Sequence, residues 1–311
     1  MSRWQTLKKV LTDRDYRMIR LAKAGAFNFM SDRNYIMTQY QVRMQRKLNL
    51  DDPQLFSEKL QWLKLNDHNP LYTQLVDKYR VREYIAEKVG QEYLIPLLGV
   101  WDDPDEIDFD ALPDQFVLKC NHNSGTGMYI CRDKSQLDQD AVRKNLRKGM
   151  RENFYKRCRE WPYKGVTRKI IAEKLMAQST DTRFEKGLDD YRFYCFHGEP
   201  RLIYVYQSSG LKYDNKPGIA SCDIFDTHWE RMPFRQKSPN APVSPLPPAN
   251  LDKMLEISRC LSQEKIFMRV DFYEVDGQLY VGELTLYPGG GFAPFYPAEW
   301  DQTIGTWLNL P

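Results

Sequence analysis

The chain has 311 residues and a formal net charge of only +3, with 42% hydrophobic and 28% charged residues. These values are ordinary for a soluble protein, and the length suggests about two domains. No run of roughly 18 apolar residues is present, which excludes a transmembrane helix. The first residues, MSRWQTLKKV, lack the apolar segment of a secretory signal. Six cysteines without Cys-x-x-Cys spacing argue against a zinc site or a redox motif, so we expect a reduced, cytoplasmic protein.

Residues 1–47 are strongly basic, with eleven Lys or Arg against three Asp, a local charge of +8. Apolar residues recur between the basic ones at helical spacing: Trp4, Leu7, Leu11, Met18 and Leu21. The segment is a candidate for peripheral contact with an anionic membrane surface or glycan. Alternatively, it is an ordinary helix that packs this apolar stripe on the domain, which is the interpretation we favour.

Residues 48–90 predict two helices. The first opens near Ser57, and the second begins near Leu71 and ends at Gly90, which is a plausible C-cap. The second helix contains DKYRVR at 77–82, whose cations suit either phosphate contact or a solvated helix surface.

A strand is predicted at 97–101, and two more at 116–119 and 128–131 flank a loop rich in Asn, Ser and Gly. Such a loop can bring backbone N–H groups to phosphate oxygens, and the alternative is a plain turn. Lys119 at the end of the preceding strand strengthens the phosphate interpretation. For His122 in the loop, a hydrogen bond to the backbone is a safer expectation than a ligand contact.

Residues 143–169, which we call the basic block, hold eleven Lys or Arg against two Glu, a local charge of +9 interleaved with aromatic residues. This mixture occurs in nucleic-acid-binding proteins. It also suits an acidic polysaccharide, whose uronate carboxylates meet cations while its sugar faces stack on aromatic rings. Like charges repel on a compact surface, so we expect an anion to bind here, with Arg147, Lys148 and Arg151 as contacts to a uronate-containing glycan. A solvated helix is the alternative.

The following stretch predicts further strands and one helix. KIIAEKLM at 169–176 is typical of a buried strand, and DDYRFYCFHGEPRLIYVYQ predicts a hairpin around His197-Gly198. The Pro-rich residues 233–250 predict a surface loop, and 250–261 a helix with Asn250 as N-cap.

The strongest local signal is IFMRVDFYEVDGQLYVGELTLYPGGGF, residues 266–292. Asp276-Gly277 between two strand-forming runs favours a two-residue hairpin loop. Alternation puts Arg269 and Asp271 on one face, and antiparallel pairing brings Asp271 close to Glu283. Neighbouring carboxylates repel each other, and Mg²⁺, which usually takes one or two carboxylates plus substrate phosphates, would compensate them. A surface hairpin with solvated acids is the alternative.

This hairpin resembles the metal hairpin of the ATP-grasp enzymes, in which an Arg-x-Asp strand is followed by Glu-x-Asn and a Pro-Gly loop. Taken whole, the chain is similar to the TupA-like ATP-grasp family from about Leu48 to the C-terminus. The matching segments are LNLDDPQLFSEKLQWLKL, VDKYRVREY, LPDQFVLKCNHNSGTG, IIAEKL, DYRFYCFHGEP and RVDFYEVDGQLYVGELT. Thr285 replaces the usual Asn, and this Glu-x-Thr form is usual in the TupA-like branch. Residues 1–47 lie outside these matching segments.

The resemblance implies roles for individual residues. Mg²⁺ would be held by Asp271, Glu283 and Thr285, and Arg269 would stabilise the transferring phosphoryl group. The implied ATP-binding residues are Arg82, Lys119, Ser124, Gly125, Gly127, Glu173, Lys174, Leu175, Asp190 and Arg192. Among them, Lys119 and the loop would hold phosphate, residues 173–175 would form the hinge that reads adenine, and Asp190 would face ribose. Gly289 and Gly290 of the Pro-Gly loop are expected to contact substrate.

The fold implied is α+β, an ATP-grasp fold in which two lobes clasp ATP. We expect a basic helical region at 1–70, a pre-ATP-grasp segment at 71–110, a small lobe at 111–172 and a large lobe at 173–311. The implied activity is ATP- and Mg²⁺-dependent ligation of an amino acid or amine to a carboxylate through an acyl phosphate. The expected acid is a uronic-acid-containing surface polysaccharide, such as a capsule, or its precursor. The alternatives are a sugar kinase and a glycosyltransferase. Against the glycosyltransferase, this chain has no Asp-x-Asp spacing within a doubly wound sheet context. We expect no nucleic-acid partner.

Overall fold

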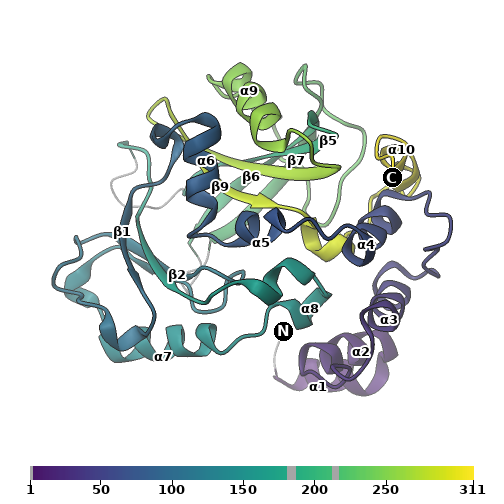
Figure 1. Cartoon of the computed structure of the whole chain (residues 1–311), viewed down its shortest axis with the longest axis horizontal. Coiled ribbons are helices and arrows are strands. Elements are labelled where there is room, and N and C mark those ends of the chain that lie inside the picture. Colours follow the sequence, from purple (N-terminus) through teal and green to yellow (C-terminus); the bar gives the residue numbers. More distant parts are fainter. Residues whose placement is uncertain (1–2, 181–186, 212–216) are drawn as a thin grey trace.

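The computed structural model describes residues 3–180, 187–211 and 217–311, which form two antiparallel sheets surrounded by helices (Figure 1). The strands are β1 Leu97–Trp101, β2 Phe116–Cys120, β3 Tyr129–Cys131, β4 Ile170–Lys174, β5 Asp190–Phe196, β6 Glu199–Leu211, β7 Pro217–Phe225, β8 Phe267–Val275 and β9 Gln278–Thr285. The α-helices are α1 Arg3–Thr12, α2 Arg14–Lys23, α3 Asp32–Met44, α4 Phe56–Asn66, α5 Leu71–Val76, α6 Val81–Val89, α7 Gln139–Met150, α8 Tyr155–Cys158, α9 Leu251–Ser262 and α10 Trp300–Gly305. The small sheet has the order β1-β4-β2-β3 and the large sheet β7-β6-β5-β8-β9, which confirms the α+β class.

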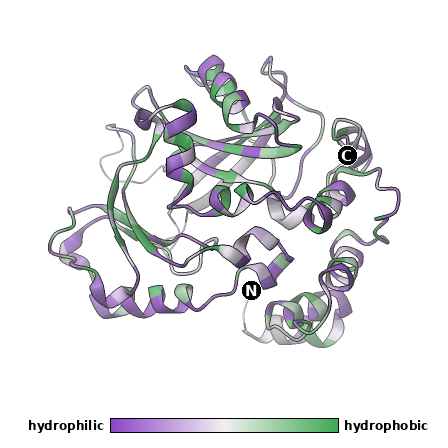
Figure 2. Ribbon diagram, in the orientation of Figure 1, coloured by the Kyte–Doolittle hydropathy of each residue, from purple (hydrophilic) through white to green (hydrophobic). Residues whose placement is uncertain are grey.

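The large sheet has one apolar and one polar face. Phe193, Val270 and Phe272 are fully buried and share one face, where the sheet packs with α9. In Figure 1, α9 and α6 lie over this sheet, and Figure 2 shows hydrophobic residues along its strands. Because side chains alternate along a strand, Arg192 and Arg269 lie on the opposite face.

Both predicted hairpins form. Asp276 (φ 49°) and Gly277 (φ 79°) join β8 to β9, while His197 (φ 49°) and Gly198 (φ 84°) join β5 to β6. Positive φ at both loop residues is the turn geometry whose twist matches that of paired strands.

The small sheet is covered by α7, which packs Val142 and Leu146 against Phe116 and Leu118. The predicted strands at 116–119 and 128–131 correspond to β2 and β3, which are paired and flank the Asn/Ser/Gly-rich loop. This sheet therefore presents the loop at one end.

The structure divides the chain differently from the expected regions 1–70, 71–110, 111–172 and 173–311. Strand β1, expected before the small lobe, pairs with β4 in the small sheet, and β4 runs across position 172. Helices α4, α5 and α6 bury Phe56, Leu75 and Tyr84 in the large-sheet core. Strand pairing and core packing join segments that are distant along the chain, so local composition does not mark these boundaries.

Two expected helices are each broken at an aspartate. Asp13 accepts a hydrogen bond from the Tyr16 backbone N–H (2.8 Å) and caps α2. Asp77 accepts from the backbone N–H groups of Tyr79 (2.9 Å) and Arg80 (3.2 Å) between α5 and α6. An aspartate side chain offers backbone N–H groups an alternative acceptor, which ends one helix and begins the next.

The apolar stripe of the N-terminal helices is largely exposed. Trp4 is 75% and Leu11 70% exposed, and Leu21 is exposed as well, while the side chain of Leu7 lies outside what the structure describes. The favoured interpretation, that the stripe packs on the domain, is therefore wrong for Trp4, Leu11 and Leu21. The region is attached instead by the buried residues of α3, which are Tyr35, Ile36, Gln39 and Tyr40. No helix in the described ranges has both the length and the apolar character needed to cross a bilayer.

Residues 226–250 form no helix or strand and contribute only isolated bridges at Arg231 and Arg235, as their Pro-rich part predicts. Asn250 precedes α9, but its side chain does not cap that helix. It donates to Glu274 Oε1 (2.6 Å) and to the Gly277 carbonyl (3.0 Å). Asn250 therefore ties the start of α9 to the β8–β9 hairpin.

Candidate active site

The polar face of the large sheet gathers the residues predicted to hold metal and phosphoryl groups. Asp271 on β8 lies directly opposite Glu283 on β9, and Arg269 lies opposite Thr285. On the other side of β8, Arg192 of β5 is opposite Asp271. Directly opposed residues point to the same face of a sheet, so these side chains converge. The predicted approach of Asp271 to Glu283 is confirmed.

Cations neutralise both carboxylates. The Nε atom of Arg269 donates to Asp271 Oδ1 (2.6 Å), and its Nη2 atom lies 3.5 Å from Glu283 Oε2. Lys78, from the connection between α5 and α6, places Nζ 3.2 Å from Glu283 Oε1. The two acids therefore lie side by side without net repulsion.

The environments of the two acids separate their pKa values. Burial raises the pKa of Asp271 to about 6, although Arg269 and Arg192 oppose the change. Burial would also raise the pKa of Glu283, but Lys78 and Arg269 outweigh it and lower that pKa to about 2. At neutral pH both groups are predominantly anionic.

The donor set on this face fits Mg²⁺. Asp271 and Glu283 supply carboxylate oxygens, and Thr285, which lines the same cavity as Glu283, supplies a hydroxyl. All three are hard oxygen donors, and Mg²⁺ commonly takes one or two carboxylates plus substrate phosphates. Over the described parts of the chain, no group of three or more His, Cys, Asp or Glu residues is placed to hold a metal ion. A metal on this face would therefore need the Thr285 hydroxyl or substrate phosphates as further ligands.

Arg192 extends the charged face toward β5. Its Nη2 atom lies 2.7 Å from Asp190 Oδ2 and its Nε atom 3.7 Å from Asp271 Oδ2, while the guanidinium lies over the Tyr206 ring at 4.1 Å. The other carboxylate oxygen of Asp190, Oδ1, is buried without a hydrogen-bond partner. A ribose hydroxyl could satisfy it, so the predicted ribose contact of Asp190 stays a prediction.

The small sheet carries a second charged cluster, made of three residues predicted to bind ATP. Lys119 Nζ lies 2.5 Å from Glu173 Oε2, and Arg82 Nη1 lies 3.7 Å from Glu173 Oε1. Strands β2 and β4 pair antiparallel, which places Lys119 and Glu173 on the same face. Next along the chain, Lys174 is exposed and Leu175 half-buried.

The segment after β4 reaches the β8–β9 hairpin. Gln178 donates to the Glu274 carbonyl (2.7 Å) and accepts from the Asp276 backbone N–H (2.9 Å). Of the hinge expected at 173–175, Glu173 and Lys174 end β4, and Leu175 begins the segment that leads away from the small sheet. The contact of this hinge with adenine stays a prediction.

The loop between β2 and β3 is anchored by buried polar groups. His122 Nε2 is hydrogen-bonded to the Glu152 carbonyl (3.1 Å), as expected from the sequence, and burial lowers the pKa of His122 to about 4. Lys78 Nζ donates to the Asn123 carbonyl (2.7 Å) as well as contacting Glu283. Lys78 therefore links the predicted phosphate loop to the predicted metal site.

Two glycines give the loop its shape. Gly125 and Gly127 have φ angles of 81° and 77°, in the left-handed region that favours glycine. A Cβ atom on Gly127 would lie 2.9 Å from the Gly149 Cα atom of α7, whereas nothing lies within 4 Å of a Cβ on Gly125. Close packing on α7 is therefore particular to Gly127, while Ser124 and Gly125 form the exposed tip.

We expect Gly127→Ala to lower stability and weaken ATP binding more than Gly125→Ala does. Both changes place alanine at positive φ, which costs roughly 1–2 kcal/mol. Only Gly127→Ala also pushes against the α7 backbone, at about 1–3 kcal/mol more. Thermal denaturation and nucleotide titration of the matched pair measure the difference, and equal losses would show that the loop does not depend on this packing.

The Pro-Gly loop after β9 is held by α4. Its glycines Gly289, Gly290 and Gly291 all have positive φ, of 60°, 66° and 71°. Buried Lys64 donates to the Gly290 carbonyl (2.8 Å), and buried Gln61 donates to the Gly291 carbonyl (2.7 Å). Two buried polar side chains therefore fix the conformation of a loop predicted to contact substrate.

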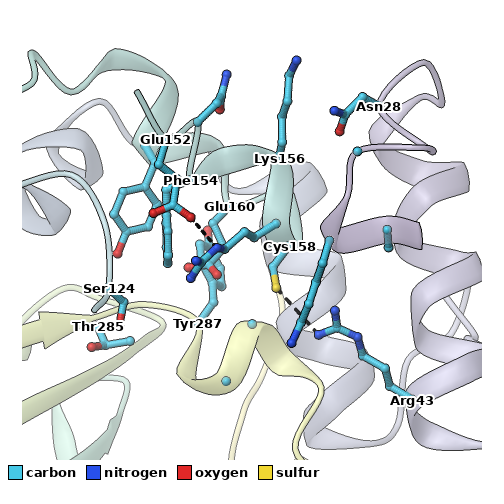
Figure 3. Close-up of a pocket in the computed structure, with 18 of the residues that line it drawn as sticks. Asn28, Arg43, Ser124, Glu152, Phe154, Lys156, Cys158, Glu160, Thr285 and Tyr287 are labelled. Carbon is cyan, nitrogen blue, oxygen red and sulfur yellow. Dashed lines mark hydrogen bonds and ion pairs between the residues drawn. The ribbon is translucent and has the colours of Figure 1, made fainter. Parts of the chain in front are cut away.

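A cavity of about 810 Å³ lies between the tip of the β2–β3 loop, the polar face of the large sheet and the Pro-Gly loop (Figure 3). The predicted site residues that line it are Ser124, Arg192, Arg269, Glu283, Thr285, Gly289 and Gly290. Figure 3 shows Ser124 and Thr285 on one side and Asn28 and Arg43 on the other. The remaining predicted residues, including Lys119 and Glu173, do not line this cavity.

The basic block is partly neutralised by four acids, three of which lie outside it. Six of its eleven cations form ion pairs: Arg143 and Arg147 with Asp105, Arg157 with Glu152, Arg159 and Lys164 with Asp32, and Lys169 with Asp102. The expectation that only a bound anion could relieve its repulsion is therefore wrong. The glycan contacts of Arg147, Lys148 and Arg151 stay a prediction, since the cations of the block that line the cavity are Lys156 and Arg157.

A family model described as TupA-like ATPgrasp matches residues 58–309. The chain belongs to the TupA-like ATP-grasp family. The match takes in both charged clusters and the β8–β9 hairpin and leaves residues 1–57 outside the family model. No curated protein matches the chain.

Several solved structures are similar to this chain at low sequence identity. D-alanine–D-alanine ligase from Bacillus anthracis is 16% identical, with a TM-score of 0.40 and coverage of 68% of this chain and 57% of that one. D-cycloserine synthetase DcsG is 15% identical, with a TM-score of 0.42 and coverage of 77% and 72%. The ATP-grasp ligase PsnB, complexed with a phosphomimetic variant of its minimal precursor, Mg and ADP, is 12% identical, with a TM-score of 0.43 and coverage of 93% and 72%. The chain spans 57% and 65% of the two Bacillus anthracis ligase chains.

Sequence reasoning missed the residues that connect the family motifs. Lys78 lies within DKYRVR, but its spacing fits a helix surface equally well, and only the fold brings it to Glu283. Gln61 and Lys64 lie on α4 among apolar residues, and the signal that could have revealed them is their position on its buried side. A polar residue at a buried helical position needs a partner, which here is the Pro-Gly loop.

Proposed function

We propose that the protein is an ATP- and Mg²⁺-dependent ligase that joins a carboxylate to an amine through an acyl phosphate. The observation that carries this proposal is the convergence of Arg269, Asp271 and Glu283 on one sheet face, beside a cavity and linked by Lys78 to the phosphate loop. Membership of an ATP-grasp family supports nucleotide chemistry at this face.

The reaction proceeds in two transfers. A carboxylate oxygen of the acid attacks the γ-phosphorus of ATP, the bond from that phosphorus to the β,γ-bridging oxygen breaks, and ADP leaves. The amine then attacks the acyl carbon, the carbon–oxygen bond to phosphate breaks, and the amine proton passes to solvent. The products are an amide, ADP and phosphate.

The residues of this chain contribute positioning and charge, which are the main means of catalysing phosphoryl transfer. Lys119 and Arg82 would hold phosphate oxygens beside the loop at 124–127, and Arg269 would stabilise charge on the transferring group. Asp271, Glu283 and Thr285 would hold Mg²⁺, which when bound neutralises phosphate oxygens.

The rest of the ligand would lie between the sheets. Residues 173–175 would contact adenine, Asp190 and Arg192 would face the ribose, and Gly289 and Gly290 would border the acid. The cavity walls would exclude water, because water would hydrolyse the acyl phosphate before the amine reached it.

Assays with isotope-labelled ATP distinguish ligase activity of this protein from the two alternative activities, sugar kinase and glycosyltransferase. Release of ADP and phosphate that requires both an acid and an amine is the expected result, read out with pools of amino acids and uronic acids. A stable phosphorylated sugar would instead identify a kinase. Release of UDP from a sugar nucleotide without ATP consumption would identify a glycosyltransferase.

We propose further that the acid belongs to a uronate-containing surface polysaccharide or its precursor, with an amino acid or amine as the second substrate. The aromatic and cationic composition of the basic block supports an anionic glycan. Charge reversal of Arg147, Lys148 and Arg151 together is expected to raise the KM for the glycan and flatten its salt dependence, with ATP binding unchanged. Normal glycan kinetics combined with lost ATP affinity would mean that the block faces the nucleotide.

We also propose that the protein is cytoplasmic and that residues 1–47 contact an anionic membrane surface at its inner face. Trp4 and Leu11 are exposed, and Lys8 lies between them at helical spacing, a combination that favours binding at a lipid interface. Co-sedimentation with anionic vesicles is expected, falling with added salt and with Trp4→Ala/Leu11→Ala. Equal binding to neutral and anionic vesicles would contradict the electrostatic part of this proposal.

A further inference from the structure

The cavity at the active site has a second wall that lies almost entirely outside the family motifs. Lys23 at the end of α2, Gly25 and Asn28 in the following connection, and Arg43 on α3 all line it. Lys156 on α8 lines it as well. In Figure 1 the helices α1 to α3 lie together beside α8, below the large sheet.

Specific contacts build this wall. Buried Arg159 donates to the Phe27 carbonyl (3.2 Å), and its guanidinium lies over the Tyr35 ring at 4.3 Å. The Tyr35 hydroxyl in turn donates to the Arg157 carbonyl (2.9 Å). The N-terminal helices are therefore docked on the segment around α8, and this docking holds them in place as one wall of the cavity.

The cations that line the cavity outnumber the acids, with six Lys or Arg against three Glu. Three of the six are already paired, since Arg157 meets Glu152, while Arg192 and Arg269 meet Asp271. The other three have no carboxylate within ion-pair distance anywhere in the described ranges, and these are Lys23, Arg43 and Lys156. The uncompensated positive charge of the cavity therefore lies on the second wall.

Arg43 is the most constrained of these cations. Its guanidinium lies 4.8 Å above the Phe292 ring, its Nη1 atom is 3.9 Å from Cys158 Sγ, and its Nε atom is buried without a hydrogen-bond partner. The ammonium of Lys64 lies over the same ring at 4.5 Å. Neither cation has a carboxylate within ion-pair distance in the described ranges. Asp32 and buried Glu160 act on Lys64 only from beyond that distance. Arg43 therefore keeps a positive potential that favours an anion.

We propose that Arg43, assisted by Lys156 and Lys23, forms an anion subsite for the acid substrate, which therefore carries a second carboxylate or phosphate. This inference rests on the proposed ligase function: the reacting carboxylate faces Arg269, and the second anionic group meets Arg43. The cavity volume of about 810 Å³ suits a small molecule, since such sites commonly measure roughly 300–1,000 Å³. The part of the substrate that occupies the cavity is accordingly a diacid or phosphorylated acid of sugar size, held at both ends.

Calorimetric titration of the full chain with three sugar acids tests the subsite without turnover. Glucuronate has one carboxylate, glucarate has two, and glucuronate 1-phosphate has a carboxylate and a phosphate. Glucarate, glucuronate 1-phosphate or both are expected to bind more tightly than glucuronate, and whichever binds better identifies the second group as carboxylate or phosphate. Arg43→Gln should remove this advantage, a loss of about tenfold to a hundredfold in Kd for a contact to a charged group. ADP affinity and glucuronate affinity should remain unchanged.

Matched variants separate recognition from a structural effect. Arg43→Lys keeps the charge over Phe292 and should retain most of the preference, whereas Lys156→Gln should reduce it. Lys47→Gln, which removes an exposed cation of the same region that does not line the cavity, should leave it intact. Wild-type protein that binds all three acids alike, or a preference that survives Arg43→Gln together with Lys156→Gln, would overturn the proposal. A preference that vanishes equally in Lys47→Gln would also do so. If the preference is present but labelled ATP shows no acid-dependent ADP release, the subsite stands and the ligase function fails.

Discussion

Asp271→Asn and Glu283→Gln are each expected to reduce turnover on the order of 10²–10⁴-fold, because each removes a charge partner that acts in the transition state. Both carboxylates lie on one face, directly opposite each other in the strand register. Each substitution keeps the shape of the side chain, so circular dichroism and the unfolding midpoint should show a folded protein. Acid-dependent ADP release measures the effect on turnover.

A binding measurement supports this prediction independently of turnover. Calorimetric titration with ADP should show that added Mg²⁺ tightens nucleotide binding in the wild type and loses this effect in both variants. Thr285→Asn is the matched control: asparagine retains an oxygen donor, so activity should persist. Full activity in Asp271→Asn or Glu283→Gln would remove these residues from the proposed metal site.

Arg269→Met is expected to abolish turnover and to lower the free energy of unfolding by about 3–5 kcal/mol, since it breaks a buried ion pair by removing one partner. Arg269 is only 7% exposed and Asp271 4% exposed, and the guanidinium contacts both Asp271 and Glu283. Without it, the nearest remaining cation to Asp271 is Arg192, at 3.7 Å. Urea denaturation gives the change in unfolding free energy.

Two comparisons distinguish this effect from general damage. The double variant Arg269→Met/Asp271→Asn should regain much of the lost stability while staying inactive, because the unpaired buried charge is gone. Arg259→Met breaks an exposed pair with Glu199 and should cost less than about 1 kcal/mol. An unchanged unfolding midpoint in Arg269→Met would mean that the buried pair does not support the fold.

The local parts of the site follow from the sequence because short-range rules determine them. Asp276-Gly277 favours the positive φ of a hairpin loop, and this turn sets the register that brings Asp271 opposite Glu283. The same reasoning locates the Asn/Ser/Gly-rich loop between β2 and β3 and the strand that carries Glu173. Each of these predictions depends on residues within one hairpin or one strand.

The helix boundaries were predicted less well, because side chains compete with the backbone at single positions. Asp13 and Asp77 accept backbone N–H groups and divide helices that apolar spacing presents as continuous. Apolar spacing likewise predicts a packed stripe at Trp4 and Leu11, but burial depends on what the rest of the chain places there. Both residues are exposed.

The sequence by itself determined the two hairpins, since periodicity and turn chemistry act over a few residues. Its motifs implied the fold class through their resemblance to the ATP-grasp enzymes. Only the tertiary structure decided which charges neutralise one another. Lys64 bonds to Gly290, 226 positions away, and the carboxylate that meets Arg147 is Asp105 in a different segment. The wall that carries Arg43 was likewise not predictable, because it depends on docking of the N-terminal helices. Ion pairs and cavity walls form wherever the folded chain brings groups together, and the spacing of residues along the sequence does not predict those contacts.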